Sequence, residues 1–214
     1  MGLNKQKGNM YPFVTHTWNA IKGKCPHDCS YCYMKIYCQP ELHFDEAELK
    51  TDLGTGNFIF VGSSCDMWAD GVDAFWLDSI MKHCCEYQNK YLFQSKNPAR
   101  FKQFKLPENT MLGTTIETNR DYAFISKAPW TYARKVEMQS LTQPKMISIE
   151  PILDFDLHRL VKWVEAVKPE FVSIGADSKG HKLPEPSPEK VRQLIEELRG
   201  ITTVKIKDNL KRLL

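Results

Sequence analysis

The chain has 214 residues, of which 42% are hydrophobic and 26% charged, with a formal net charge of +3 at pH 7. This composition is typical of a globular protein with one large α/β domain or two small ones. No apolar run approaches the roughly 20 residues that a membrane-spanning helix needs, and the first residues lack the apolar core of a signal peptide. We therefore expect a cytoplasmic protein with no membrane partner, and the small net charge is weak evidence for a polyanionic one.

Short apolar runs rich in β-branched and aromatic residues recur along the chain and predict strands. Each run is bounded by small polar or turn residues, and the last run is more polar than the others. The predicted strands cover 13–18, 58–63, 90–95, 111–117, 145–151, 170–176 and 202–207.

Apolar residues at helical spacing follow several of these strands and predict helices over 72–84, 157–167 and 191–198. Ser187 and Pro188 precede the last helix, and Gly200 follows it, as is common at helix ends.

The alternation of strands and helices favours an α/β fold with a parallel sheet and right-handed crossovers. Six such units predict a partial (β/α)6 TIM-like barrel, because the full eight typically take about 250 residues. We expect a single domain over 1–214, with a core over about 13–180 and a C-terminal strand and helix cap over 181–214. In such folds ligands bind at the carboxyl ends of the strands, so the residues that close each strand are the candidate site residues.

The cysteines are unevenly distributed, with four of the seven lying between Cys25 and Cys38. An odd count with local spacing favours metal binding over a disulfide framework. The first predicted strand runs into KCPHDCSYCY, which spaces Cys25, Cys29 and Cys32 as C-x3-C-x2-C. Iron–sulfur clusters normally take four cysteine thiolates. Three would leave one iron open to a substrate or cofactor.

A zinc site is the alternative interpretation of these cysteines, with His27 or Cys38 as the fourth ligand. Structural zinc sites usually combine two ligand pairs, and no second pair is present. His27 lies between two of the cysteines, which makes simultaneous coordination awkward, whereas Cys38 is six residues beyond Cys32. An iron–sulfur cluster is the favoured interpretation, and zinc stays open.

The sequence resembles the radical S-adenosylmethionine superfamily, whose signature is this cysteine motif with an aromatic residue, here Tyr31, before the last cysteine. The signature follows the first strand of a partial (β/α)6 barrel. The chain looks more specifically like a short bacteriophage-type branch related to spore photoproduct lyase-like proteins. The matching stretches are THTWNAIKGKC, FVGSSCDMWADGV, LFQSKNPARF, TTIETN, ISIEPIL and VSIGADSKG.

The resemblance implies that Cys25, Cys29 and Cys32 hold a 4Fe–4S cluster. This cluster would cleave S-adenosylmethionine to methionine and a 5′-deoxyadenosyl radical, which abstracts hydrogen from a substrate. An external electron donor of the flavodoxin or ferredoxin type would be required. The favoured substrate is a nucleic-acid base or nucleotide. The alternatives are a small metabolite or peptide and, from another class, a non-catalytic zinc or iron–sulfur binding module.

The resemblance also implies cofactor-binding residues at the strand ends. The family's Gly-Gly-Glu after the second strand is replaced by Gly62, Ser63 and Ser64, whose hydroxyl or carbonyl oxygens would accept from the methionyl amine. Lys96 would meet the methionine carboxylate as a point charge. Each strand-end residue could instead be a helix N-cap or a surface charge. The further expected contact residues are Ser95, Thr115, Glu117, Asn119, Glu150, Gly175, Ala176 and Asp177.

The remaining cysteines and the C-terminal lysines give weaker indications. Cys65 follows the second strand and could reach the site as a thiol hydrogen donor, whereas Cys84 fits the apolar stripe of a helix. Cys85 faces another direction. Lys205 and Lys207 alternate as in a strand, so both should point the same way, and a lysine here could face the substrate.

Overall fold

The computed structural model describes residues 2–8 and 10–214, so residues 1 and 9 of the predicted domain lie outside the described residues. Its centre is an eight-stranded sheet in the order β1-β2-β5-β6-β7-β8-β9-β10. From β2 to β10 every neighbouring pair is parallel, and β1 pairs antiparallel with β2. The strands are β1 Asn4–Lys5, β2 His16–Trp18, β5 Phe58–Val61, β6 Lys90–Gln94, β7 Thr110–Thr115, β8 Lys145–Ile149, β9 Phe171–Ile174 and β10 Thr203–Ile206.

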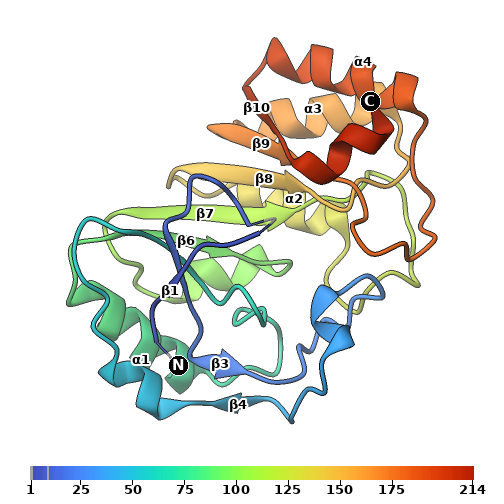
Figure 1. The fold of residues 1–214 in the computed structure, drawn as a ribbon. Coiled ribbons are helices and arrows are strands. Elements are labelled where there is room, and N and C mark those ends of the chain that lie inside the picture. Colours follow the sequence, from blue (N-terminus) through green and yellow to red (C-terminus); the bar gives the residue numbers. More distant parts are fainter. Residues whose placement is uncertain (1, 9) are drawn as a thin grey trace.

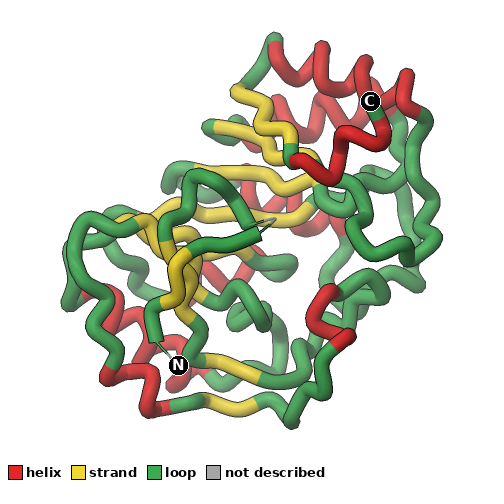
Figure 2. Tube along the Cα trace, viewed as in Figure 1, coloured by secondary structure: helices red, strands yellow, loops and turns green. Residues whose placement is uncertain are grey.

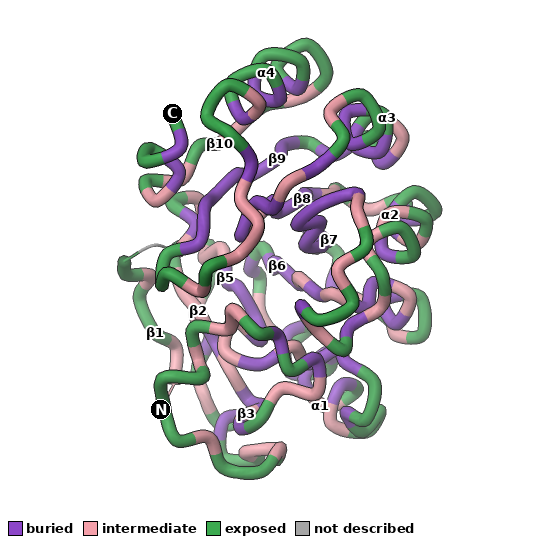
Figure 3. Tube along the Cα trace, turned by 90° about the vertical axis from the view of Figure 1, so that its right-hand side faces the viewer, coloured by how far each residue is buried: buried purple, intermediate pink, exposed green. Residues whose placement is uncertain are grey.

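Helices follow the outer face of the curved sheet, and the N-terminal chain lies on its inner side (Figures 1 and 3). The α-helices are α1 Ala74–Cys85, α2 Thr131–Gln139, α3 Leu157–Val167 and α4 Pro188–Arg199. The shorter elements are β3 Ile21–Lys22, β4 His43–Phe44 and the 3-10 helices η1 Tyr33–Ile36, η2 Glu46–Lys50, η3 Pro98–Gln103 and η4 Asp208–Leu213. Within the described ranges, none of the helices has the length and apolar character needed to cross a bilayer.

Local signals explain where the predicted helices begin and end. The Asp73 carboxylate accepts from the Phe75 amide at 2.7 Å and caps α1. The Ser187 hydroxyl accepts from the Lys190 amide at the start of α4. Lys168 adopts a left-handed conformation with φ 54° and ends α3. The seven predicted strands and three predicted helices are confirmed.

The structure adds two elements to the predicted sheet and helix layer. Helix α2 has no apolar stripe, because its buried residues are Arg134 and Met138. Strand β1 is only two residues long, and its antiparallel direction departs from the all-parallel prediction.

The barrel interior is divided into an apolar floor and a polar upper part. The residues of the floor come from alternate positions of five strands and from the N-terminal segment, and they are Tyr11, Val14, Phe60, Leu92, Met111, Met146 and Phe171. The neighbouring strand positions, such as Val61 and Phe93, face the helices and join the larger core. Long loops gather at the carboxyl ends of the strands (Figure 2), so a site can form above the floor.

Candidate functional site

A cavity of about 520 Å³ opens at the carboxyl ends of the strands. It is lined by the cysteine loop, by strand ends from β5 to β10 and by the N-terminal segment. Most of the residues predicted from the strand ends and the cysteine motif line it together. They are Cys25, Cys29, Cys32, Gly62, Ser63, Ser64, Ser95, Lys96, Thr115, Glu150, Ala176 and Asp177.

The cysteine loop is held against the segment that follows β7. The Ser30 amide donates to the Ile125 carbonyl at 2.8 Å, and the Lys127 amide donates to the His27 carbonyl at 2.7 Å. Asp28 at the tip has a left-handed φ of 45° and pairs with Lys35 at 2.7 Å. The loop is therefore fixed by backbone contacts on its outer side while its thiols line the cavity.

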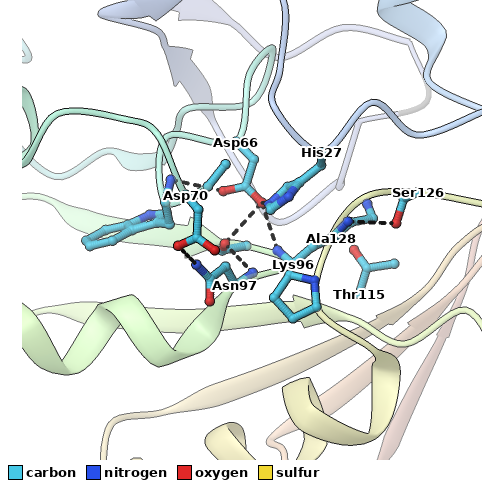
Figure 4. A network of polar contacts seen from close by, with 12 residues as sticks. His27, Asp66, Asp70, Lys96, Asn97, Thr115, Ser126 and Ala128 are labelled. Atoms are coloured by element: carbon cyan, nitrogen blue, oxygen red, sulfur yellow. Dashed lines mark hydrogen bonds and ion pairs between the residues drawn. The ribbon is translucent and has the colours of Figure 1, made fainter.

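Asp66 connects the cysteine loop to the end of β6 (Figure 4). Its Oδ2 accepts from the Lys96 amide at 2.8 Å and the Ser95 hydroxyl at 3.0 Å, and it lies 2.9 Å from His27 Nε2. Its Oδ1 accepts from the Trp68 amide at 3.0 Å. Burial raises the pKa of this carboxyl, but His27 and the β6 donors outweigh burial and hold it below its usual value.

This arrangement bears on the zinc alternative. His27 is buried and turns Nε2 toward Asp66. Among the residues that the structure describes, no three His, Cys, Asp or Glu side chains converge as ligands of one ion would. Cys38, the other suggested fourth ligand, is exposed. His27 and Cys38 are therefore not placed as a fourth zinc ligand beside the three cysteines, and the choice between zinc and a cluster stays a prediction.

The three thiols differ in their electrostatic surroundings. The thiol of Cys65 hydrogen-bonds the sulfur of Cys25, which lowers the pKa of Cys25 to about 6 and raises that of Cys65. Burial raises the pKa of Cys29, and the nearby Lys96 ammonium partly offsets this. Thiolates are the metal-binding form of cysteine, so Cys65 and Lys96 both favour that form in the loop.

Tyr31 contacts a network of charged side chains formed by Glu117, Arg134 and Lys96. The Tyr31 hydroxyl donates to Glu117 Oε1, and Arg134 Nη1 donates to Glu117 Oε2 at 2.9 Å. Lys96 Nζ lies 3.9 Å from Glu117 Oε1 and 5.4 Å from the Tyr31 ring centroid. Burial raises the pKa of Glu117, but Arg134, Lys96 and Tyr31 outweigh burial and lower it. Glu117 therefore does not line the barrel cavity and acts on it through Tyr31 and Lys96.

Asn119 and Gly175 also lie outside the cavity lining. The Asn119 amide group accepts from the Asp156 amide and donates to the Asp156 carbonyl, both at 2.9 Å, and so fixes the start of α3. A Cβ on Gly175 would lie 2.7 Å from Glu150 Oε1 and 2.9 Å from Asn209 Oδ1. The cofactor contacts expected of Asn119 and Gly175 stay predictions, and the structure gives both residues an architectural reason to be present.

The opposite wall of the cavity carries polar residues from β10 and the N-terminal segment. Lys207 Nζ donates to Glu150 Oε2 at 2.7 Å and lies 4.9 Å from the Tyr11 ring centroid. The Tyr11 hydroxyl donates to Ser148 Oγ at 2.9 Å. Lys205 points the same way but lies over the Phe171 ring of the floor.

Sequence reasoning missed several residues that line the cavity, among them Tyr11 and Gln94. Gln94 closes β6 and donates to Thr115 Oγ1 at 3.2 Å, so the strand-end rule could have found it. Tyr11 precedes the first strand of the barrel, and no local signal indicates that this segment turns inward.

Comparisons with known proteins find likeness in solved structures alone. No family model matches the sequence, and no curated protein matches it. A spore photoproduct lyase variant superposes with a TM-score of 0.66 at 10% identity, over 94% of this chain and 78% of the other. A second, with dinucleoside spore photoproduct, gives 0.60 at 11% identity, over 92% of this chain and 64% of the other.

A further match is anSMEcpe with bound AdoMet and a peptide, at a TM-score of 0.51 and 11% identity, over 89% of this chain and 62% of the other. The chain thus spans less than two thirds of the length of some of these proteins. At such identities the likeness is one of fold, and the bacteriophage-type branch stays a prediction. The chain shares an α/β partial-barrel fold with these spore photoproduct lyase structures and with anSMEcpe, as the alternation of strands and helices predicted.

Proposed function

We propose that the chain is a radical S-adenosylmethionine enzyme in which Cys25, Cys29 and Cys32 hold a 4Fe–4S cluster. The main support is that these three thiols line one side of a cavity at the carboxyl ends of the strands of this fold. When bound, the cluster supplies the electron that cleaves S-adenosylmethionine, and the resulting 5′-deoxyadenosyl radical takes a hydrogen atom from a substrate.

The chain's own residues would prepare the site for this chemistry in two ways. Asp66 and the backbone contacts to Ile125 and Lys127 hold the cysteine loop in place, which limits its movement when metal is bound. The apolar floor beneath the cavity excludes water from below, which protects a reactive radical from side reactions.

Polar groups on the cavity wall suit the ends of S-adenosylmethionine. The Lys96 ammonium is a point charge for the methionine carboxylate. The Ser63 hydroxyl donates to Asn19 Oδ1 at 3.2 Å, so its oxygen lone pairs are available to the methionyl ammonium. Thr115 and Asp177 provide acceptors and a hydroxyl for the ribose and adenine.

The favoured substrate is a nucleic-acid base or nucleotide, and the electron would come from an external flavodoxin-like or ferredoxin-like donor. A dinucleoside occupies similar structures of spore photoproduct lyase. The wall formed by Glu150, Lys207, Tyr11 and Gln94 offers hydrogen-bond donors and acceptors beside an aromatic ring, which suits a planar base. A peptide is the second candidate, because anSMEcpe carries one.

Anaerobic reconstitution with iron and sulfide tests the proposal. We expect a brown protein that forms 5′-deoxyadenosine from S-adenosylmethionine after reduction, and we expect Cys29→Ala to lose both properties. Cys85→Ala removes an exposed thiol at the end of α1 and is the matched control that keeps both. A colourless protein that binds zinc through the same cysteines, or 5′-deoxyadenosine formation by Cys29→Ala, would refute the proposal.

Deuterated candidate substrates separate the substrate classes. Transfer of deuterium into 5′-deoxyadenosine from an oligonucleotide supports the favoured class. Transfer from a peptide alone would replace it with the second candidate.

A further inference from the structure

A second cavity, of about 470 Å³, lies outside the barrel and is called the side groove here. It is bordered by the segment 117–130 that follows β7 and by the first turns of α2 and α3. Among the described residues, none lines both this groove and the barrel cavity. The contacts between Tyr31 and Glu117 and between Glu117 and Arg134 connect the barrel cavity to the side groove, because Tyr31 lines the first and Glu117 and Arg134 line the second.

Four aromatic side chains line the side groove: Tyr122, Trp130, Tyr132 and Trp163. Two of them are open to solvent, with Trp130 70% exposed and Tyr132 54% exposed. Trp163 is buried at the back of the groove, with its ring centroid 5.5 Å from that of Tyr132. Large aromatic rings that stay exposed together mark interaction sites, because folding alone would favour covering them.

Cationic side chains lie among these rings. The Arg159 guanidinium is 5.3 Å from the Trp163 ring centroid, and Lys135 Nζ is 5.8 Å from that of Tyr132. In the part of the chain that the structure describes, neither cation pairs with a carboxylate. The other arginine at the rim, Arg120, is bound by Asp154 and Asp156 and is therefore less available to a ligand.

We propose that the side groove binds an unpaired base and adjoining phosphate of a single-stranded nucleic acid. Exposed indole and phenol faces are stacking platforms for any base, and arginine and lysine beside them neutralise the backbone. The cavity is of the size that holds a small planar ligand. A flat apolar protein interface would not need cations placed over its rings. The inference deepens the proposed nucleic-acid substrate and rests on that part of the proposed function, but it is independent of the barrel chemistry.

Binding of a labelled single-stranded DNA of mixed sequence and about 12 nucleotides to the full reconstituted chain, followed by fluorescence anisotropy, tests the groove. We expect Trp130→Ala to weaken binding roughly 5- to 150-fold, which corresponds to about 1–3 kcal/mol for one stacked base. Trp130→Phe keeps an aromatic face and should restore most of the affinity. Phe75→Ala removes an equally exposed ring (67%) from α1 and should leave binding unchanged.

A salt titration separates phosphate contact from stacking. Arg159→Ala should reduce the slope of log Kd against log salt by about 0.7, because one phosphate contact is lost. Trp130→Ala should leave that slope unchanged. A parallel titration with an RNA of the same sequence shows whether the groove binds single-stranded DNA or single-stranded RNA more tightly.

Three results would overturn the inference. The first is a parent chain that binds neither the DNA nor the RNA oligonucleotide at low salt. The second is a pair of variants, Trp130→Ala and Arg159→Ala, that bind the oligonucleotide as tightly as the parent does. The third is a Trp130→Ala chain whose oligonucleotide affinity is unchanged but which no longer self-associates or binds a protein. That result would assign the side groove to a protein partner instead. Formation of 5′-deoxyadenosine without oligonucleotide is measured on the same samples, so failure of the groove and failure of the radical chemistry are distinguished.

Discussion

Replacing Glu117 by glutamine tests the buried network that stands between the barrel cavity and the side groove. The carboxylate is 3% exposed and accepts from Arg134, itself 4% exposed, while Lys96 Nζ lies 3.9 Å away. Glutamine keeps the shape but removes the charge, so the buried Arg134 guanidinium and the partly buried Lys96 ammonium lose their counter-charge. Removing one partner of a buried ion pair costs about 3–5 kcal/mol, because the other charge is left uncompensated. In a chain of this size that loss corresponds to a fall in Tm of roughly 6–20 °C.

Urea unfolding of the parent and Glu117→Gln at pH 7 measures this loss. Glu137→Gln is the matched control, because its pair with Lys102 is far more exposed than the Glu117–Arg134 pair and is worth at most about 1 kcal/mol. The folded-state pKa of Glu117 is lowered, so its contribution is full above the unfolded value of about 4.3 and is lost as pH falls through the folded value. The difference in the free energy of unfolding between the parent and Glu117→Gln should therefore become smaller at acidic pH. If Glu117→Gln loses no more free energy of unfolding at pH 7 than Glu137→Gln does, the reasoning is refuted.

Three further substitutions have defined outcomes. Gly175→Ala should destabilise the chain by about 1–3 kcal/mol in urea unfolding, because its Cβ would displace the Glu150 carboxylate from Lys207 and Asn209; an unchanged midpoint would contradict this. Asp66→Asn should lower iron retention about tenfold or more in a chelator titration while the fold is kept, and parent-like retention would mean that this carboxylate does not hold the cysteine loop. Asp154→Asn should cost about 1 kcal/mol at pH 7, since Lys190 and Arg120 hold the pKa of Asp154 low. That cost should vanish as pH falls through the folded pKa, and a cost that persists in acid would show that the ion pairs are not its source.

Much of the fold follows from local patterns in the sequence. The parallel strands are short apolar runs, and three of the four helices have apolar stripes with capping residues at their ends. Helix α2 is not predicted by this reasoning because one of its buried positions is Arg134. Its charge is compensated by Glu117, which follows β7, and by backbone carbonyls. In the sequence alone, a buried arginine cannot be distinguished from a surface arginine, because its carboxylate partner is not known.

The candidate site is predictable where it depends on strand ends and is not where it depends on closure of the barrel. Lys96 and Thr115 line the cavity because they lie at the carboxyl ends of the parallel strands β6 and β7, which meet at one edge of the sheet. Tyr11 and Lys207 reach the same cavity because the N-terminal segment folds under β10, a contact between opposite ends of the chain. No periodicity within either segment encodes that contact.

The segment that follows β7 illustrates what sequence and structure each contribute. Four aromatic residues, Tyr122, Phe124, Trp130 and Tyr132, lie within eleven positions, and in sequence they are indistinguishable from core residues. The backbone of this segment contacts the cysteine loop, through the Ile125 carbonyl and the Lys127 amide. Tyr122 is half-buried, whereas the rings of Phe124, Trp130 and Tyr132 are exposed. Exposure, which only the fold determines, is therefore the property that separates a binding surface from a packed one. The same segment contacts the cysteine loop and borders the side groove.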